Sequence, residues 1–141
     1  MNEWGRRVAA VNATRVRFAG RPFAYGSVDC ARVAAWHLRQ MGHKPVGFAK
    51  AGTYRSALGA KKALQRLGHV SLADAVAALG LEERSPAGAW VGDLLIKPGT
   101  QGLDAIGIVA GSALVLGFHE DAEAIDMMRM LDFADARAFH L

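Results

Sequence analysis

The sequence predicts one domain of the α+β class, with helices in the first half of the chain and strands after them. Apolar residues recur at helical spacing until about residue 79. After Pro86, short apolar or alternating runs separated by glycines are typical of β-strands. A chain of 141 residues with 52% hydrophobic content is the size of one domain with its own core. Because the helices precede the strands rather than alternate with them, we expect N-terminal helices packed on a C-terminal antiparallel sheet, all within a single domain of residues 1–141.

Four helices are expected in the first half of the chain. Asp29 can cap the second helix, because its carboxylate can accept the free backbone amides of the first turn. Ser71 and Asp74 fit a capping box at the start of the fourth helix, and Gly80 ends it. The expected ranges are 2–17, 30–41, 53–67 and 72–79.

The strands are expected to be short and largely buried. The best candidates are 90–96, 104–110 and 113–118, and the weaker ones are 123–127 and 136–141. The longest apolar run, 105–118, contains Gly107, Gly111 and Gly117 and falls short of the roughly 20 residues that a membrane-spanning helix needs. We therefore read it as two strands and expect no membrane span.

The charges of the chain are distributed unevenly. The first 21 residues contain several arginines but no long apolar run, so we expect no secretory signal and synthesis in the cytoplasm. Basic residues lie scattered along the predicted helices without interleaved aromatics, so nucleic acid is not an expected partner. The C-terminal part is acidic instead, which could help neighbouring subunits dock. Its acidic residues are Glu120, Asp121, Glu123, Asp126, Asp132 and Asp135.

Cys30 is the only cysteine, so no intrachain disulfide can form. One cysteine and dispersed histidines offer no metal-ligand spacing, and we expect neither a metal nor another cofactor. The thiol is either inert packing on the inner face of its helix or a reactive group. A position on the first helical turn helps to stabilise a thiolate through the free amides and the helix dipole, but the helix and the cysteine alone favour inert packing.

The segment around Cys30 resembles the nucleophile motif of NlpC-type cell-wall peptidases, which have a papain-like fold. Residues 23–30, Phe-Ala-Tyr-Gly-Ser-Val-Asp-Cys, match an aromatic-x-aromatic-Gly loop followed by Asp-Cys at a helix start. Residues 92–96 are similar to the Gly-Asp-hydrophobic strand of that family, and residues 104–111 are similar to the strand that follows it. The resemblance implies an NlpC-type domain with Cys30 as the nucleophile.

The chain is more similar to a branch of phage and prophage proteins found among tail genes. In that branch the cysteine motif is followed by a Gly-x-Tyr-Arg/Lys segment and an alanine-rich helix ending in Leu-Gly, as in residues 52–55 and 60–68 here. This resemblance implies a protein of the virion, placed in the phage tail after synthesis in the bacterial host cytoplasm. Other phage tail proteins are the expected partners, with peptidoglycan as the substrate if hydrolysis is retained.

The catalytic base of the NlpC family has no obvious counterpart. A cysteine hydrolase needs a group that takes the thiol proton, and in these enzymes it is a histidine at the start of the second motif strand. Here that position falls on Ala105, with Asp104 beside it. His119 is the candidate replacement, because it lies two residues beyond the family's third polar position and such residues share a strand face. The alternative for His119 is an exposed loop histidine.

Three further residues have more than one interpretation. Tyr25 either assists the oxyanion and lines a substrate groove, as the family's aromatic does, or packs the loop over the helix. Asp93 and Asp29 are expected to be structural, as a turn residue and a helix cap. His140 is expected to lie at the surface end of a strand.

Two functions of different classes remain. The first is a tail-tip or tail-assembly component that has an NlpC-type fold and degenerate or lost hydrolase activity. The second is an active peptidoglycan cysteine amidase or endopeptidase that aids cell-wall penetration, with Cys30, His119 and Tyr25 in the catalytic site. The missing histidine favours the first function, and the Asp-Cys loop favours the second.

Overall fold

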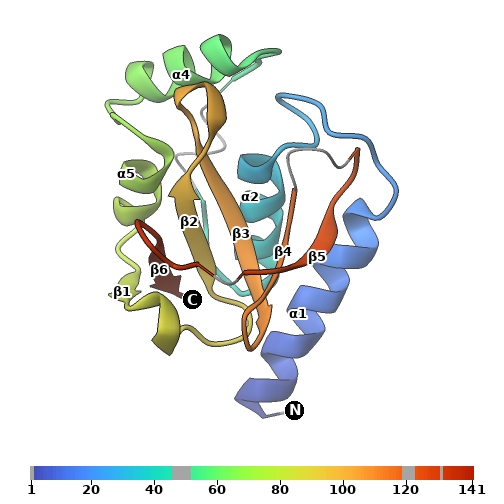
Figure 1. Ribbon diagram of the computed structural model, residues 1–141. Helices are drawn as coiled ribbons and strands as arrows, with labels where there is room; N and C mark the ends of the chain where they lie inside the picture. Colours follow the sequence, from blue (N-terminus) through green and yellow to red (C-terminus); the bar gives the residue numbers. More distant parts are fainter. Residues whose placement is uncertain (1, 46–51, 119–122, 131) are drawn as a thin grey trace.

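The computed structural model describes residues 2–45, 52–118, 123–130 and 132–141. In these residues, α-helices come first and one six-stranded sheet follows (Figure 1). This confirms the α+β class and the helix-first order. The helices are α1 (Glu3–Phe18), α2 (Cys30–Gln40), α4 (Ala57–Arg66) and α5 (Leu72–Ala77).

Every pair of neighbouring strands in the sheet is antiparallel, as expected. The order across the sheet is β1-β6-β2-β3-β4-β5, so the last strand of the chain lies between the first two. The strands are β1 (Glu82–Arg84), β2 (Leu94–Pro98), β3 (Asp104–Gly111), β4 (Leu114–Gly117), β5 (Asp126–Arg129) and β6 (Arg137–His140). Two short 3-10 turns, Pro86–Gly88 and Thr100–Gly102, flank β2.

The helices are not distributed evenly around the sheet. Helix α2 packs on β3, and α1 packs alongside α2 (Figure 1). Helix α5 contacts β3 and β6, whereas α4 crosses one end of the molecule beyond the first turn of α2. The first turn of α2, where Cys30 lies, is therefore enclosed between the sheet and the α4 end of the molecule.

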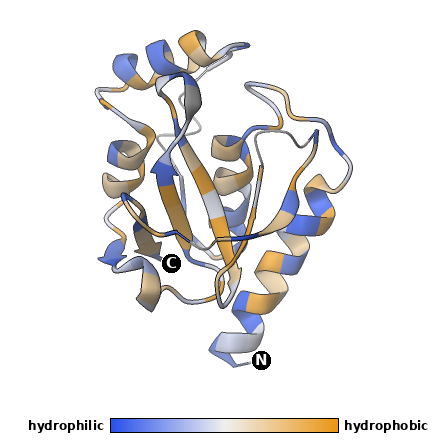
Figure 2. Ribbon diagram, in the orientation of Figure 1, coloured by the Kyte–Doolittle hydropathy of each residue, from blue (hydrophilic) through white to orange (hydrophobic). Residues whose placement is uncertain are grey.

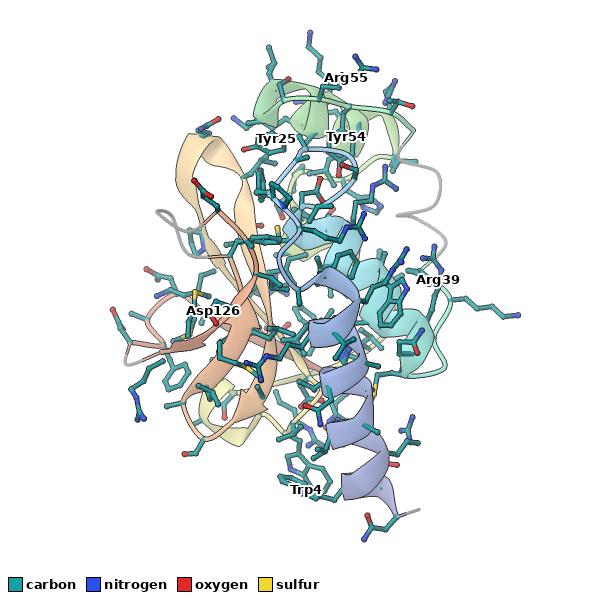
Figure 3. All side chains as sticks on the ribbon, turned by 90° about the vertical axis from the view of Figure 1, so that its right-hand side faces the viewer. Trp4, Tyr25, Arg39, Tyr54, Arg55 and Asp126 are labelled. Atoms are coloured by element: carbon teal, nitrogen blue, oxygen red, sulfur yellow. The ribbon has the colours of Figure 1, made fainter. Side chains whose placement is uncertain are left out.

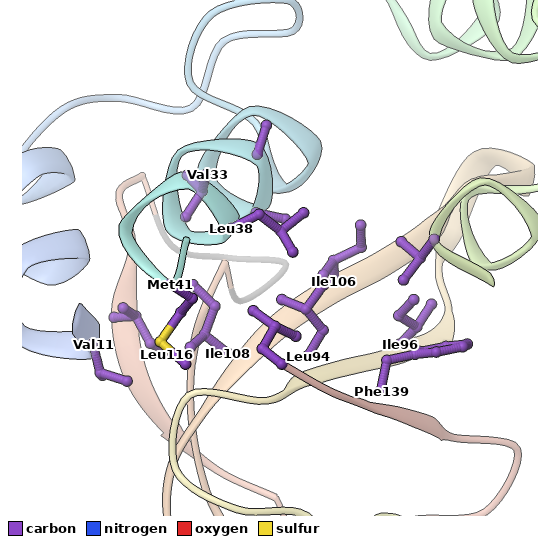
Figure 4. Close-up of a cluster of buried hydrophobic side chains, with 14 of the residues drawn as sticks. Val11, Val33, Leu38, Met41, Leu94, Ile96, Ile106, Ile108, Leu116 and Phe139 are labelled. Atoms are coloured by element: carbon purple, nitrogen blue, oxygen red, sulfur yellow. The ribbon is translucent and has the colours of Figure 1, made fainter. Parts of the chain in front are cut away.

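The main hydrophobic core lies between α2 and the sheet (Figure 4). Leu38 of α2 is fully buried there, together with Leu94 of β2 and Ile108 of β3. Figure 2 agrees with this location of the core: β2 and β3 are largely hydrophobic, while the helices carry hydrophilic residues on their outer faces. Burying apolar side chains of this size contributes roughly 1.5–3 kcal/mol each, so this layer stabilises the position of α2.

A second, smaller cluster covers the opposite face of the sheet. It contains Leu95, Val109, Val115 and Ala138, each from a different strand. Strand residues alternate between the two faces, so Ile106 and Ile108 face the helices whereas Val109 faces this second cluster.

Several predicted boundaries are wrong. The third helix begins at Ala57 rather than residue 53, because Ser56 caps it by accepting from the Gly59 amide. The strand predicted at 90–96 begins at Leu94, because Asp93 accepts hydrogen bonds that close a turn before it. Strand β1 (Glu82–Arg84) lies before Pro86 and was not predicted, because a three-residue charged segment lacks the apolar pattern of a strand.

Candidate functional site

Cys30 is the first residue of α2, and Asp29 is its N-cap, as the sequence predicted. Asp29 Oδ1 accepts the Arg32 backbone amide over 2.8 Å, which satisfies one of the free donors of the first turn. The Asp-Cys pair therefore starts the helix in the expected way.

The second carboxylate oxygen of Asp29 joins two other segments to this helix start. Oδ2 accepts hydrogen bonds from the Gly26 amide and from the Tyr54 hydroxyl, both over 2.7 Å. Asp29 is only 4% exposed, so the three bonds replace the water that a charged carboxylate would otherwise have. Asp29 is thus a buried connection between the loop before α2, α2 itself and the segment before α4.

Gly26 is required by this arrangement. Its φ of 84° lies in the left-handed region, which favours glycine. In addition, a Cβ at this position would collide with the Tyr54 carbonyl oxygen. The tight loop and the extended Tyr54 segment therefore pack directly against each other.

The Cys30 sulfur lies in an apolar environment. The Asp104 carbonyl oxygen lies 4.0 Å from Sγ, at the long limit for a thiol hydrogen bond, and the backbone amide of Ile106 also interacts with the sulfur. The small pocket that contains the side chain is lined by aliphatic and aromatic groups. These are Val33, Ala34, Ile106, Ile108, Leu116, Gly117, Phe118 and Ile125.

This environment opposes ionisation of the thiol. Burial, with a smaller contribution from the nearby charge of Asp29, raises the pKa of Cys30 from an ordinary value of 9.0 to about 11. Backbone amides, Ile106 foremost, lower the pKa but do not compensate for burial. At neutral pH the thiol is therefore protonated, and the helix start alone does not produce a nucleophile.

Ala105, where the family resemblance places the base, does not direct its side chain toward Cys30. The side chain of Ala105 points to the sheet face opposite Cys30, because the alternate residues Ile106 and Ile108 face α2. Asp104 and Ile106 are the β3 residues on the cysteine side. The Asp104 carboxylate accepts the Ala73 amide over 3.0 Å at the start of α5, so it is already engaged in a structural bond.

His119 lies outside the described residues, and its role as a replacement base stays a prediction. The other histidines bond elsewhere or make no side-chain hydrogen bond in the described part of the chain. His69 Nδ1 is 3.3 Å from Asp74, and His37 bonds to Thr14 and Gly92. None of the described side chains provides Cys30 with a base.

Tyr25 belongs to a cluster of three aromatic rings. Phe23 packs edge-to-face on Tyr25 and on Phe118, with ring centroids 4.9 and 5.1 Å apart. Because Phe118 also lines the Cys30 pocket, the cluster joins the loop before α2 to that pocket. In Figure 3 Tyr25 and Tyr54 lie at the same end of the molecule, beside α4. This geometry fits the packing role for Tyr25, and its catalytic role stays a prediction.

A second buried network surrounds Asp93 and has no contact with Cys30. Asp93 is fully buried and accepts from Arg7 Nη1 over 2.9 Å and from the Trp90 amide over 2.8 Å. His140 Nδ1 donates to the same carboxylate over 3.0 Å, while Nε2 faces Arg7 Nη2 at 3.2 Å. Arg7 also donates to the carbonyl oxygens of Val91 and Leu141. Asp93 is therefore structural, as expected. His140 ends β6, also as expected, and its side chain is 21% exposed, but its contact with Asp93 was not predicted.

Sequence reasoning missed the partners of both aspartates. Tyr54 lies in the Gly-x-Tyr-Arg segment, and Asp29 lies in the Asp-Cys motif. Both motifs resemble the same branch of phage proteins, and this shared resemblance is the signal that could have suggested the Tyr54–Asp29 bond. Arg7 and His140 are 133 positions apart, and no local pattern pairs them with Asp93. Nothing in the local sequence of α1 distinguishes Arg7 from the other arginines of that helix.

The match to a protein family covers nearly the whole chain. Residues 1–139 match a family model described as a domain of unknown function, DUF6950. The chain belongs to this family. No curated protein and no solved structure matches the chain. The DUF6950 match thus identifies the family and leaves the activity to be argued from the residues.

Two structural findings concern metal binding and membrane insertion. Within the described ranges, no three His, Cys, Asp or Glu side chains come together as metal ligands would. Within the same ranges, none of the helices combines the length and apolar character needed to cross a membrane.

Proposed function

We propose that this chain is a phage or prophage tail-associated protein, a tail-tip or tail-assembly component with an NlpC-type fold and degenerate or lost hydrolase activity. The resemblance of residues 23–30, 52–55 and 60–68 to the tail-gene branch supports the place of action. The setting of Cys30 supports the loss of activity.

The Cys30 environment is the observation that carries the proposal. A cysteine hydrolase needs a thiolate, and an adjacent imidazole normally supplies it by taking the proton. Here burial raises the thiol pKa to about 11, and the polar neighbours of Sγ in the described structure are backbone groups rather than a basic side chain. A thiol in such a pocket contributes packing rather than chemistry.

The remaining motif residues have structural roles that do not require catalysis. Asp29 connects three segments, Gly26 permits their close approach, and Tyr54 completes the hydrogen bonds of the carboxylate. An assembly protein needs these contacts as much as an enzyme does. The Asp-Cys loop is therefore compatible with a domain that performs no hydrolysis.

The test has one arm for each half of the proposal. For the place of action, purified tails from the phage or induced prophage that encodes the chain are analysed by mass spectrometry, and a fixed copy number per particle is expected. Absence from tails and from tail-assembly intermediates would contradict the assembly role.

For the chemistry, purified chain is incubated with peptidoglycan, and released stem peptides are measured by liquid chromatography. We expect no release above the Cys30→Ala control. Release that requires both Cys30 and His119 would instead establish the peptidoglycan hydrolase. The Tyr25→Phe variant then separates a catalytic hydroxyl from a packing ring.

A further inference from the structure

The charges of the chain are divided between its two halves. Residues 1–73, which contain α1, α2 and α4, include thirteen lysines and arginines but two acidic residues. Residues 74–141, which contain α5 and the sheet, include eleven acidic and four basic residues. Because α1 and α2 lie on one side of the sheet, this difference along the chain becomes a difference between two faces of the molecule.

The outer surface of α1 and α2 is basic. It carries Arg15, Arg17 and Arg39, which are all exposed and define what we call the basic face. In the described structure none of these three arginines takes part in an ion pair. Glu3 is the exposed acid of the two helices, and it is already paired with two other arginines of α1. Val16, which is 77% exposed, adds an apolar side chain to the basic face.

The opposite side of the sheet carries three exposed aspartates, Asp126, Asp132 and Asp135, which define the acidic face. Asp126 lies on β5, two residues before Met128, and Met128 pairs with Val115 of the second hydrophobic cluster. Strand residues two positions apart share a face of the sheet. Asp126 therefore projects on the side away from α1 and α2.

The other two aspartates lie on a segment that crosses the same side of the sheet. Phe133 and Ala136 pack inward on the second cluster, whereas Asp132 and Asp135 are exposed. Lys97 is a basic residue on this side, and its Nζ donates to the main-chain carbonyl oxygen of Asp132 over 3.1 Å. Within the described ranges, no ion pair involves the carboxylates of the acidic face. This face therefore keeps a negative charge.

The basic and acidic faces point in opposite directions. In Figure 3, Arg39 of α2 and Asp126 of β5 lie on opposite sides of the molecule, with α1 between them. A two-fold contact would place one face against itself and bring like charges together. Stacking the basic face of one copy on the acidic face of the next brings opposite charges together instead, and complementary charges of this kind determine which surfaces meet.

We propose that copies of this chain associate head to tail, with the basic face of one copy docked on the acidic face of the next. Val16 on one face and the half-buried Phe133 on the other provide apolar surface for the contact. Contacts of this kind close into a ring or continue as a filament. The proposal rests on the assembly role above, and it adds the partner, a second copy, and the two surfaces that meet.

A second copy fits the two faces better than another anionic partner. A nucleic acid or an anionic membrane would contact the basic face alone, and the acidic face would stay without a counter-charge. A second copy neutralises both faces with the same contact. The charge complementarity within one chain is therefore the observation that selects this partner.

Sedimentation velocity of the purified chain over a range of concentrations tests the association. We expect the average sedimentation coefficient to rise with concentration at about 0.05 M NaCl. The association constant should fall at least about tenfold when NaCl is raised to about 0.5 M, because salt screens exposed charges.

Two neutralised variants test which surfaces meet. The basic-face variant carries Arg15→Gln, Arg17→Gln and Arg39→Gln, and the acidic-face variant carries Asp126→Asn, Asp132→Asn and Asp135→Asn. Asparagine keeps the acceptor oxygens that bond to the backbone amides of Met127 and Ala134. The association constant of each variant should fall at least about tenfold. Thermal unfolding verifies that both variants are folded.

Matched controls remove the same number of charges outside the two faces. The basic control carries Arg55→Gln, Lys61→Gln and Lys62→Gln at the α4 end, and the acidic control carries Asp74→Asn, Glu82→Gln and Glu83→Gln on α5 and β1. Each control should change the association constant by less than about twofold.

Mixing the two face variants separates head-to-tail contact from every symmetric contact. The basic-face variant keeps an intact acidic face, and the acidic-face variant keeps an intact basic face. An equimolar mixture should therefore form dimers of one copy of each, with an association constant within about threefold of that between wild-type copies, and no larger species. A mixture that stays monomeric would contradict the head-to-tail contact.

Three further outcomes would overturn the proposal. These are a wild-type chain that stays monomeric up to about 1 mM at low salt, face variants that associate as tightly as their controls, or a monomeric wild type whose basic face binds oligo-dT or vesicles containing phosphatidylglycerol. Tails that incorporate the acidic-face and basic-face variants normally would also refute this contact while leaving the assembly role intact. Absence of the wild-type chain from tails would instead refute the assembly role itself.

Discussion

The Tyr54 hydroxyl donates a hydrogen bond to Asp29 Oδ2 over 2.7 Å, which joins the segment before α4 to the residue that starts α2. Burial and the charge of Asp29 raise the pKa of Tyr54 well above its ordinary value, so the phenol keeps its proton and stays a donor. The aspartate of the Asp-Cys pair is thus positioned by an aromatic residue 25 positions further along the chain.

Tyr54→Phe should lower the free energy of unfolding by about 1–3 kcal/mol, because it removes a hydrogen bond to a buried charged acceptor without changing the ring. Urea denaturation followed by circular dichroism measures the change. Tyr25→Phe is the matched control, since its hydroxyl makes no hydrogen bond in the described structure, and it should change stability by less than about 0.5 kcal/mol. Equal effects of the two substitutions would contradict the special role of the Tyr54–Asp29 bond.

Arg7→Met should destabilise the fold by about 3–5 kcal/mol, because it removes the guanidinium that pairs with the fully buried Asp93 carboxylate. Arg6→Met is the control from the next position of the same helix. Arg6 also pairs with Glu3, but this pair is exposed and contributes less than about 1 kcal/mol. Denaturation midpoints of the two variants compare them directly. A small loss for Arg7→Met would show that the buried network does not stabilise the fold.

His37 should make the protein less stable in acid. Burial, with a smaller effect of the Arg7 charge, lowers the pKa of His37, and its Nε2 faces the Gly92 carbonyl oxygen at 2.8 Å. The lowered pKa favours a neutral imidazole in the folded state, with Nδ1 2.9 Å from the Thr14 hydroxyl oxygen. The unfolded chain binds a proton near pH 6.5, so the stability present above that pH is lost as the pH falls.

Urea denaturation between pH 7.5 and 5 measures this dependence. In His37→Gln, which does not titrate in that range, stability should fall less steeply with decreasing pH than in the wild type, although it starts from a lower value. The same slope in both proteins would rule out His37 as the group responsible.

Cys30 should react slowly with iodoacetamide at pH 7, and the rate should rise only as the pH approaches about 11. The Phe118→Ala variant opens the apolar pocket and should shift the profile to lower pH, because it reduces the burial that raises the thiol pKa. The His119→Ala variant should have the wild-type profile. Rapid reaction near pH 6 that is lost in His119→Ala would overturn the inactive reading of the thiol.

The same thiol should contribute to stability at alkaline pH. Its pKa is higher in the folded state than the ordinary 9.0, so the contribution is complete below pH 9 and is lost as the pH rises toward 11. The difference in unfolding free energy between the wild type and Cys30→Ala should therefore shrink by up to about 2–3 kcal/mol over this window. A difference that does not change with pH would show that the pocket does not favour the protonated thiol.

The order of elements could be predicted because it depends on local signals. Asp29 and Ser71 are side-chain caps whose effect is confined to the next turn, and both start helices where expected. The β3 residues Asp104–Gly111 carry enough apolar character to be read as a strand without knowledge of their partners. Strand β1 could not be predicted, because it pairs with β6, a segment more than fifty positions away in the chain.

The candidate site could be predicted only in part. The position of Cys30 at a helix start could be predicted from the sequence, because the capping residue Asp29 directly precedes the helix in the chain. The sequence did not reveal which residues of β3 face the sulfur, because register decides which face a side chain occupies and a one-residue difference reverses it. The partners of Asp29 and Asp93 come from distant segments that meet only in the folded chain.

The sequence by itself determined the class of the fold and the helix that begins at Cys30, since these follow from local pattern and capping chemistry. Only the tertiary structure decided that the thiol lies in a small pocket among aliphatic and aromatic groups. The reason is physical: a pKa and a cavity depend on which atoms surround a group in space, and packing brings those atoms from segments that are far apart in the chain.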